Sequence, residues 1–259
     1  MVDLQLINGD CVKELKKLKD NTIDLVVTSP PYNCGIDYDS YNDSKSFDEY
    51  FKWCQCWIDE LYRVVKEDGR IAINVLIEQG IENNTKRISP MMFFSRMIEK
   101  SGFNIMGLPM WTDSHRVKFT AWGSYKSASS PYIYNPYEVI IIAYKKFKKK
   151  QYVGENTISK EDFMMGCSGI WNLKTETKQL TKANFSVSLP KLIIELLSYK
   201  NDVILDPFSG SATTGVACFQ TERNYIGIEI SKNYHEIAKK RLENICSQEE
   251  LFKFYEKEK

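Results

Sequence analysis

The chain has 259 residues, 43% of them hydrophobic, and its formal net charge is +1 at pH 7. This hydrophobic content is sufficient for a large core, whereas a charge near zero excludes a protein that binds polyanions over its whole surface. No apolar run is long enough for a membrane span and no leader sequence is recognisable, so we expect a cytoplasmic protein without membrane contact. The seven cysteines lack the spacing of a disulfide framework or a zinc site, so we expect free thiols and no metal.

The N-terminal part of the chain predicts two buried strands and a loop. The apolar run 4–7 ends at Gly9-Asp10, and the apolar run 23–27 ends at Thr28-Ser-Pro-Pro-Tyr32. Both runs have the length and the apolar content of strands that are covered on both faces. Residues 33–45 are polar and rich in turn-forming residues, so they predict a mobile loop.

A long helix is predicted after this loop. Ser46-Phe-Asp-Glu49 has the pattern of a capping box, in which a serine and a glutamate satisfy each other's backbone N–H groups at a helix start. Apolar residues then recur at helical spacing as far as Val65, and Gly69 is expected to stop the helix.

The rest of the chain continues the alternation of strands and helices. Strands are predicted at 70–75, 139–143, 203–205 and 225–228, and helices at 90–100, 189–200, 212–221 and 232–246. Apolar strands that alternate with helices indicate a doubly wound α/β fold, with a mostly parallel sheet covered on both faces. Residues 145–182 interrupt the pattern because they are polar and irregular, as an inserted segment would be.

One strand-to-helix junction predicts a nucleotide-type cofactor site. Asp206-Pro-Phe-Ser-Gly-Ser-Ala-Thr-Thr-Gly215 follows a predicted strand and precedes a predicted helix. A glycine in such a turn lets the backbone come close to a ligand, and a helix start offers unpaired N–H groups. Glu229 ends the next strand, where an acid can accept hydrogen bonds from ribose hydroxyls. An ordinary glycine-rich turn with a surface glutamate is the alternative.

A second junction, Ser29-Pro-Pro-Tyr32, offers hydrogen-bond acceptors. Two prolines hold the segment extended and remove two N–H donors, so its carbonyls are rigid acceptors. An exocyclic amino group needs such acceptors when it attacks a methyl sulfonium, and the tyrosine can stack on an extruded base. A Pro-Pro turn with a packing tyrosine is the alternative.

Together, the two junctions resemble those of the DNA amino-methyltransferases, which make N4-methylcytosine or N6-methyladenine. The segment that begins at Asp206 is similar to their cofactor motif, and Ser29-Pro-Pro-Tyr32 is similar to their catalytic motif. The catalytic motif comes first in the chain, as in the circularly permuted β group of this family. The resemblance covers nearly the whole chain. It implies a doubly wound, mostly parallel sheet of the Rossmann-like methyltransferase type, with S-adenosyl-L-methionine as cofactor.

The resemblance also implies roles for individual residues. The catalytic residues would be Ser29, Pro30, Pro31 and Tyr32. The cofactor-binding residues would be Asp10, Asp206, Pro207, Phe208, Ser209, Gly210, Ser211, Thr213 and Glu229, with Glu229 on the ribose and Asp10 at the adenine edge. Thr181, Asn184 and Ser186 would approach the carboxylate end of the cofactor, although the chain lacks the His- and Pro-rich segment that the family usually has there.

The implied reaction is a direct transfer. The Ser29 hydroxyl and the Pro30 carbonyl would accept the N–H groups of the target amino group, on a base flipped out of duplex DNA. A serine in the first motif position favours N4 of cytosine, and N6 of adenine is the alternative. An RNA amino-methyltransferase and an inactive DNA-binding homologue are further alternatives.

The implied partner is double-stranded DNA, and a cognate restriction endonuclease and a homodimer are compatible with the resemblance. We expect a catalytic part at 1–144, a target-recognition insertion at 145–182 and a cofactor-binding part at 183–259. The candidate DNA-binding residues are Tyr38, Arg116, Lys118, Lys145 and Lys148, from the loop 33–45 and from a basic and aromatic stretch further on.

Overall fold

The computed structural model describes residues 2–36, 39–41, 43–81, 86–112, 126, 128–129, 131, 133, 135–174 and 186–257, with 248–257 described by their backbone alone. The strands of the main sheet are β1 (Leu4–Asn8), β2 (Ile23–Thr28), β3 (Val65–Leu76), β6 (Asn104–Gly107), β7 (Met110–Thr112), β8 (Glu138–Tyr144), β9 (Ile170–Asn172), β10 (Val203–Asp206) and β11 (Asn224–Glu229). The helices are α1 (Cys11–Leu15), α2 (Phe47–Val64), α3 (Pro90–Lys100), α4 (Lys160–Gly166), α5 (Ser188–Leu197), α6 (Thr213–Gln220) and α7 (Lys232–Lys257). A separate hairpin pairs β4 (Gln79–Ile81) with β5 (Lys86–Ile88).

The direction of the strands decides where the site lies. Within the described residues the sheet has the order β1-β11-β10-β2-β3-β8-β7-β9, and β6 also pairs with β8. The strands from β1 to β3 in this order are parallel, so their carboxyl ends share one edge, which we call the carboxyl edge and mark by Thr28, Asp206 and Glu229. β8 runs antiparallel to β3, so its first residue, Glu138, lies opposite Leu76 at this same edge.

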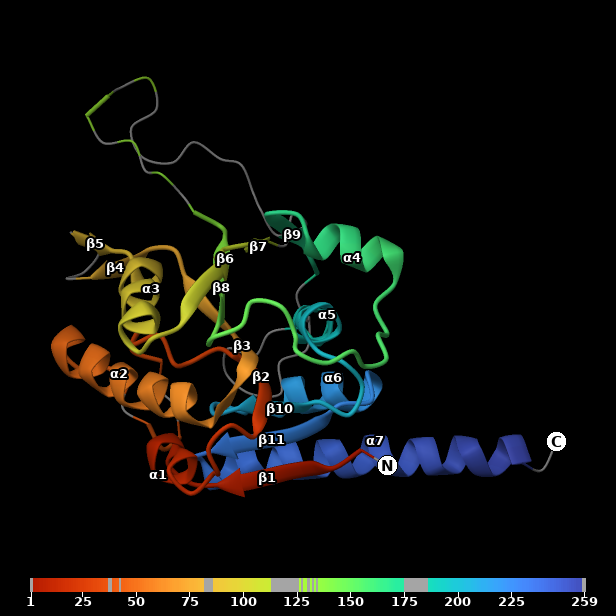
Figure 1. The fold of residues 1–259 in the computed structure, drawn as a ribbon. Coiled ribbons are helices and arrows are strands. Elements are labelled where there is room, and N and C mark those ends of the chain that lie inside the picture. Colours follow the sequence, from red (N-terminus) through yellow and green to blue (C-terminus); the bar gives the residue numbers. More distant parts are fainter. Residues whose placement is uncertain are drawn as a thin grey trace.

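Helices cover both faces of the sheet (Figure 1). α1, α2 and α3 contribute to one apolar cluster, in which Trp57 and Phe94 are buried, and α5, α6 and α7 contribute to the other, with Ile193 and Ala217. All seven cysteines are free thiols, as predicted. The doubly wound, mostly parallel α/β fold is therefore confirmed.

The helix α2 begins as predicted and ends earlier. Ser46 accepts a hydrogen bond from the backbone N–H of Glu49, and the Glu49 carboxylate accepts one from the backbone N–H of Ser46, so the capping box is present. The predicted continuation to Gly69 is wrong, because the helix ends one residue before Val65 and Val65 begins β3. Val65 has an extended backbone and pairs with Ile23 of β2. Its branched side chain suits a strand, and apolar spacing alone did not distinguish the two states.

The segment 145–182 is predicted to be irregular, but where it is described it contains regular elements and joins the main sheet. It contains the helix α4 and the strand β9, which pairs in parallel with β7. Trp171 of β9 lies opposite Trp111 and is fully buried, so this part packs with the sheet. Three-residue strands such as β7 and β9 are too short for a periodic pattern, which is why the sequence missed them. The division of the chain at 144 and 182 stays a prediction.

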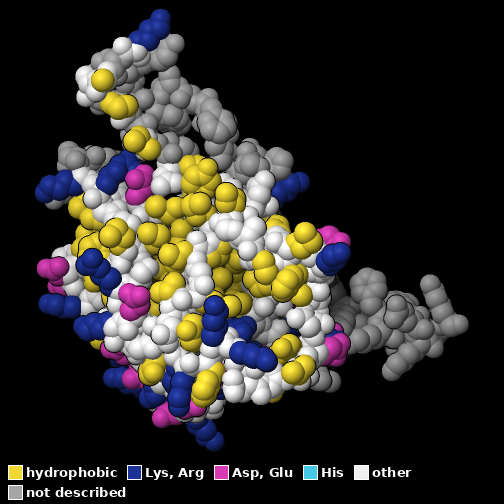
Figure 2. All heavy atoms as spheres, turned by 45° about the horizontal axis from the view of Figure 1, so that its top comes forward, with side chains coloured by type: hydrophobic (Ala, Val, Ile, Leu, Met, Phe, Trp, Pro, Cys, Tyr) yellow, Lys and Arg dark blue, Asp and Glu magenta, His cyan; other side chains and the backbone are white. Residues whose placement is uncertain are grey.

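The surface carries mixed charges. Figure 2 shows hydrophobic side chains gathered at the centre of the face that is turned forward there, with Lys and Arg side chains distributed around them. Met92 and Phe93 of α3 are among the large hydrophobic side chains that are exposed. In the part of the chain that the structure describes, no helix combines the length and the apolar character needed to cross a membrane.

Candidate active site

A hydrogen bond joins the two predicted motifs at the carboxyl edge. Thr28, which immediately precedes Ser29, donates its hydroxyl hydrogen to Oδ1 of Asp206 at 2.7 Å. Thr214 donates to Oδ2 at 2.7 Å, and the backbone N–H of Phe208 donates to Oδ1 at 3.1 Å. Burial raises the pKa of Asp206 above its usual range, against these three donors, which lower it. Asp206 therefore fastens the two loops together, and its direct contact with a cofactor stays a prediction.

Glu229 ends β11 with its carboxylate held in a fixed orientation. Oε2 accepts the backbone N–H of Gly210 and Oε1 accepts that of Ser231, each at 2.8 Å. Gly210 has a φ of 52°, a conformation that favours glycine, and the turn that it makes directs this N–H toward Glu229. Each carboxylate oxygen keeps a lone pair for another donor. Burial raises the pKa of Glu229 to about 7, although the two N–H donors act in the opposite direction.

Asp10 lies next to Glu229 because β1 and β11 are neighbours in the sheet. The backbone N–H of Gly9 donates to the carbonyl of Glu229 at 2.9 Å, which places the following residue at the carboxyl edge. Asp10 caps α1, since its Oδ1 accepts the backbone N–H of Lys13 at 3.0 Å. One carboxylate oxygen thus serves the helix, and Oδ2 is the atom that the predicted contact with an adenine edge would use.

The hydroxyl side chains of residues 206–215, which we call the predicted cofactor loop, are turned into the protein. Ser209 Oγ accepts a hydrogen bond from the Tyr225 hydroxyl at 2.9 Å. The guanidinium of Arg241 donates to the carbonyl of Ser211 and to the hydroxyl of Thr213, each at 3.1 Å. Ser209, Ser211 and Thr213 are all buried. These hydroxyls therefore serve the protein, whereas Phe208 and Gly210 of the same loop are only partly buried.

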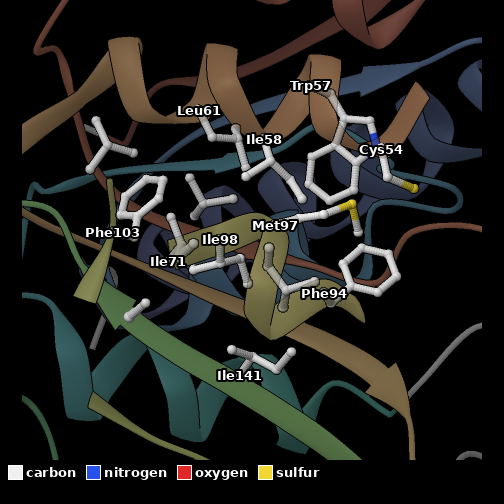
Figure 3. Close-up of a cluster of buried hydrophobic side chains, with 14 of the residues drawn as sticks. Cys54, Trp57, Ile58, Leu61, Ile71, Phe94, Met97, Ile98, Phe103 and Ile141 are labelled. Carbon is white, nitrogen blue, oxygen red and sulfur yellow. The ribbon is translucent and has the colours of Figure 1, made fainter. Parts of the chain in front are cut away.

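Phe208 connects the cofactor loop to α2 through aromatic contacts. Its ring centroid lies 5.7 Å from that of Trp53 and 5.2 Å from that of Trp57, both in edge-on geometry. Trp57 belongs to the buried cluster shown in Figure 3, where it lies near Phe94 of α3. The ring centroid of Tyr41 lies 5.3 Å from that of Trp53, so Tyr41 extends these aromatic contacts. An aromatic surface therefore extends from the cofactor loop to the loop that follows the catalytic motif.

The loop 33–45 has a hydrogen-bonded framework that its composition did not predict. The carboxylate of Asp43 accepts three backbone N–H groups at 2.8, 2.9 and 3.1 Å, those of Asn33, Cys34 and Ile36. Three such bonds to one side chain hold the start of the loop in a closed turn. The polar composition gives no sign of this framework, and the mobility of the loop stays a prediction.

Ser29 and Tyr32 lie together with two residues that the sequence did not single out. Ser29 Oγ and Tyr32 Oη are 2.8 Å apart, and Tyr32 donates to Oε2 of Glu138 at 2.9 Å. The amide Nδ2 of Asn74 donates to the same Glu138 oxygen at 2.6 Å and to Tyr32 Oη at 3.0 Å. The antiparallel pairing of β3 with β8 brings Asn74 and Glu138 to this place. The available signal was a polar residue inside one apolar strand and an acid directly before another.

The two prolines of the catalytic motif have different surroundings. Pro30 is buried, and the carbonyl of Pro31 accepts a hydrogen bond from the Tyr50 hydroxyl at 2.7 Å. Tyr50 is a buried residue of α2, so the helix holds the loop that carries Ser29. The carbonyl of Pro31 is thus used by the protein, and that of Pro30 is the predicted acceptor for a substrate.

The structure does not bring the candidate DNA-binding lysines to this site. Lys145 and Lys148 follow the far end of β8, opposite the end that carries Glu138. Lys145 Nζ donates to the backbone carbonyl of Val65 at 2.9 Å. Ser186, which was predicted to approach the carboxylate end of the cofactor, is buried just before α5. A role for the two lysines in DNA binding stays a prediction. Five other predicted residues lie outside the described part of the chain: Tyr38, Arg116, Lys118, Thr181 and Asn184.

Comparison with known proteins places the chain beside DNA methylases. The family model N6_N4_Mtase, described as DNA methylase, matches residues 23–240. The chain is 35% identical over 177 residues to the Type II methyltransferase M.MjaVI of Methanocaldococcus jannaschii, which covers 68% of this chain and 88% of that protein. It is 29% identical over 257 residues to the Type II methyltransferase M.HpaI of Haemophilus parainfluenzae, which covers 94% of this chain and 75% of that protein.

Solved structures share the fold. The crystal structure of TTHA0409 from Thermus thermophilus, complexed with S-adenosyl-L-methionine, has a TM-score of 0.73 at 22% identity and covers 92% of each chain. The cytosine-N4-specific PvuII DNA methyltransferase has a TM-score of 0.70 at 17% identity, covering 91% of this chain and 85% of that one. At these low sequence identities the structural similarity shows the fold alone. It confirms the predicted Rossmann-like methyltransferase architecture.

Proposed function

The chain belongs to the family of DNA methylases described by this model (N6_N4_Mtase), and on that premise we propose that it methylates the exocyclic N4 of cytosine at specific sites in duplex DNA. As a member of this family, it is a DNA amino-methyltransferase and uses S-adenosyl-L-methionine as its methyl donor. The observation that carries the proposal is the position of Ser29. This uncharged acceptor directly follows Thr28, whose hydrogen bond of 2.7 Å to Asp206 connects residues 29–32, which we call the catalytic loop, to the cofactor loop.

The residues at the carboxyl edge fit S-adenosyl-L-methionine. Each carboxylate oxygen of Glu229 accepts one backbone N–H and keeps a lone pair, so Glu229 would hold the two ribose hydroxyls. Asp10 Oδ2 would meet the adenine edge, and Phe208 with Trp53 offers an aromatic surface to the ring. The bound cofactor supplies an activated methyl group.

The catalytic loop would prepare the amino group of the base for attack. The lone pair of this nitrogen is partly delocalised into the ring, so it is a weak nucleophile. The Ser29 hydroxyl and the Pro30 carbonyl would accept its N–H groups and localise the lone pair. Direct attack then needs no covalent bond between enzyme and base. Holding the two reactants in line contributes about 7 kcal/mol or more in favourable cases.

The same loop supports the choice of substrate. A target base in duplex DNA would be flipped out at a cost of roughly a few kcal/mol. It would stack on the ring of Tyr32, whose hydroxyl is held by Glu138 and Asn74. The uncharged Ser29 in the first motif position favours cytosine N4 by the family's pattern, and adenine N6 is the alternative that the experiment separates.

The product identifies the function directly. The protein is incubated with S-adenosyl-L-methionine and unmethylated plasmid DNA, which is then digested to nucleosides for mass spectrometry. We expect N4-methylcytosine from the wild type, and no product from Ser29→Ala with unchanged cofactor binding. N6-methyladenine would overturn the choice of base and retain the reaction. No modified nucleoside, with cofactor binding shown by calorimetry, would contradict the proposal and favour an RNA substrate or an inactive binder.

The names of the relatives support a partner. M.MjaVI and M.HpaI are Type II methyltransferases, so we extend the proposal to a cognate restriction endonuclease that cuts the same sequence. Sequencing that maps the methylated sites would define this sequence. An endonuclease that cuts there should then fail to cut plasmid that the protein has methylated.

A further inference from the structure

A carboxylate ends the chain of hydrogen bonds that begins at the catalytic serine. The contacts run from Ser29 Oγ to Tyr32 Oη at 2.8 Å and from Tyr32 to Glu138 Oε2 at 2.9 Å. The amide of Asn74 donates to Glu138 Oε2 at 2.6 Å. An ionised carboxylate only accepts hydrogen bonds, and Oε2 accepts two of them here. Glu138 therefore stands as the acceptor on which the other three side chains are oriented.

The number of hydroxyl hydrogens in this series of hydrogen bonds fixes which atom donates in each of them. Tyr32 has one hydroxyl hydrogen, and the bond to the ionised Glu138 uses it. The bond between Tyr32 and Ser29 can then form only if Ser29 is the donor. Once the Ser29 hydrogen points to Tyr32, the Ser29 oxygen presents only lone pairs to a substrate. An oxygen in that state accepts an N–H and cannot donate.

We propose that Glu138 is a positioning residue, which in its ionised form holds Ser29 as a hydrogen-bond acceptor for the amino group of the target base. This inference rests on the proposed function. It names the residue that makes the Ser29 hydroxyl an acceptor and not a donor toward the substrate. When Glu138 is protonated, its own hydrogen can bond to Tyr32. The Tyr32 hydrogen is then released and can turn to Ser29. Ser29 then presents its hydrogen to the substrate, where it opposes an N–H.

The surroundings of Glu138 make this switch sensitive to pH. Two titratable groups from the segment after β2 lie near Glu138. They are the Tyr32 hydroxyl and the Cys34 thiol. Asn74 of β3 donates to the Glu138 carboxylate. The backbone partners of Glu138 are Leu76 of β3 and Trp111 of β7, and none of these three neighbours carries a charge. Burial raises the pKa of Glu138 above its usual range, and the hydrogen bonds from Tyr32 and Asn74 lower it in part. The pKa of the Cys34 thiol is raised to about 11, so Cys34 is neutral when Glu138 titrates.

The test compares the pH dependence of single-turnover methylation in four proteins: wild type, Glu138→Gln, Glu138→Ala and Glu67→Gln. In the wild type we expect the rate to fall as the pH falls through the pKa of Glu138. Glutamine has nearly the same shape, its carbonyl oxygen can accept from both Tyr32 and Asn74, and it does not titrate. Glu138→Gln should therefore keep much of the rate and lose this acid limb.

The alanine variant tests the acceptor itself. Without Glu138 the Tyr32 hydrogen can turn to Ser29 at any pH, so we expect the rate above the pKa of Glu138 to fall about 10- to 100-fold and the acid limb to disappear. Tyr32→Phe provides a second variant, because it removes the link between Glu138 and Ser29 and should also abolish the acid limb. Glu67→Gln is the matched control, since Glu67 is an exposed acid of β3 that pairs with Lys146. It should behave as the wild type.

The outcomes separate this inference from the proposed function. Thermal melting and cofactor binding are measured for each variant to confirm that it folds. If the wild type yields no modified nucleoside, the proposed function fails. If the wild type methylates DNA and Glu138→Gln keeps the same acid limb, with the rate lowered by one factor at every pH, Glu138 has only a packing role and the inference is overturned.

Discussion

The hydroxyl of Thr28 donates a hydrogen bond to a carboxylate oxygen of Asp206 at 2.7 Å, although 178 positions separate the two residues in the chain. The bond spans β2 and β10, which are neighbours in the sheet. It connects the end of the strand that carries the catalytic loop to the start of the cofactor loop. We therefore expect this buried contact to contribute to the geometry between the two reactants.

Thr28→Val tests this contact, because valine keeps the shape and suits a strand but has no hydroxyl. One oxygen of the buried Asp206 loses a donor, so we expect the free energy of unfolding to fall by about 1–3 kcal/mol, as measured by urea denaturation. The methylation rate should fall as well, since the two loops are no longer tied. Thr22→Val, before the same strand, removes an exposed hydrogen bond to Lys19 and serves as the control. Unchanged stability and rate in Thr28→Val would contradict the coupling of the loops.

Cofactor affinity should depend on pH through Glu229. In the proposed complex the ribose hydroxyls would donate to the ionised carboxylate, and burial raises the pKa of Glu229 to about 7. Its neutral form therefore predominates below that pH, and binding should tighten as the pH rises. By linkage, we expect the dissociation constant from calorimetry to be about tenfold higher at about pH 6 than at about pH 8.

Glu229→Gln should bind the cofactor weakly and without this pH dependence, because glutamine does not titrate. Glu67→Gln, far from the carboxyl edge, should retain the wild-type dependence. A wild-type dissociation constant that is constant over this range would show that Glu229 is fully ionised there or does not contact the ribose.

Asn74→Asp should move the acid limb of the methylation rate to higher pH. The substitution places a second carboxylate beside Glu138 and removes an N–H donor from it, and both changes raise the pKa of Glu138. We expect a shift of about one pH unit or more in the pH–rate profile. Asn74→Ala removes the donor without adding charge, so its shift should be smaller. An acid limb at the wild-type position in Asn74→Asp would be inconsistent with the role of Glu138.

Tyr50→Phe should loosen the catalytic loop. It removes the hydroxyl that donates to the carbonyl of Pro31 at 2.7 Å and leaves the buried ring in place. We expect the free energy of unfolding to fall by about 1 kcal/mol and the methylation rate to fall more than the cofactor affinity. Tyr62→Phe, on the same helix, is the matched control because the Tyr62 ring packs on Phe103. Equal losses of rate in the two variants would argue against a role for the Pro31 contact.

Much of the sheet could be predicted because its strands are short apolar runs that end at recognisable turns. Apolar spacing does not determine the structure at Val65. Its apolar side chain continues the helical spacing of α2, yet its backbone pairs with Ile23 of β2. Only the tertiary pairing decides between the two states. For the same reason β9 was missed, since three residues become a strand only when β7 lies beside them.

The residues of the site that belong to sequence motifs could be predicted, and those outside the motifs could not. Ser29 and Glu229 are found because each lies at the end of an apolar strand, within a pattern that has a chemical reason. Glu138 and Asn74 lie in no such pattern, and their contact joins residues 64 positions apart. The antiparallel direction of β8 determines that contact, and nothing local to either residue encodes it.

β8 begins at the carboxyl edge, where the parallel strands of the sheet end. Its first residue is Glu138, which is paired with Leu76 on one side and Trp111 on the other. Strand ends fray more easily than strand centres, with free energies well below that of global unfolding. The orientation that we propose for Ser29 is therefore only as persistent as the first residue pairs of β8. On heating, methylation activity should be lost at a lower temperature than that of global unfolding. Amide hydrogen exchange at the start of β8 should rise over the same temperature range.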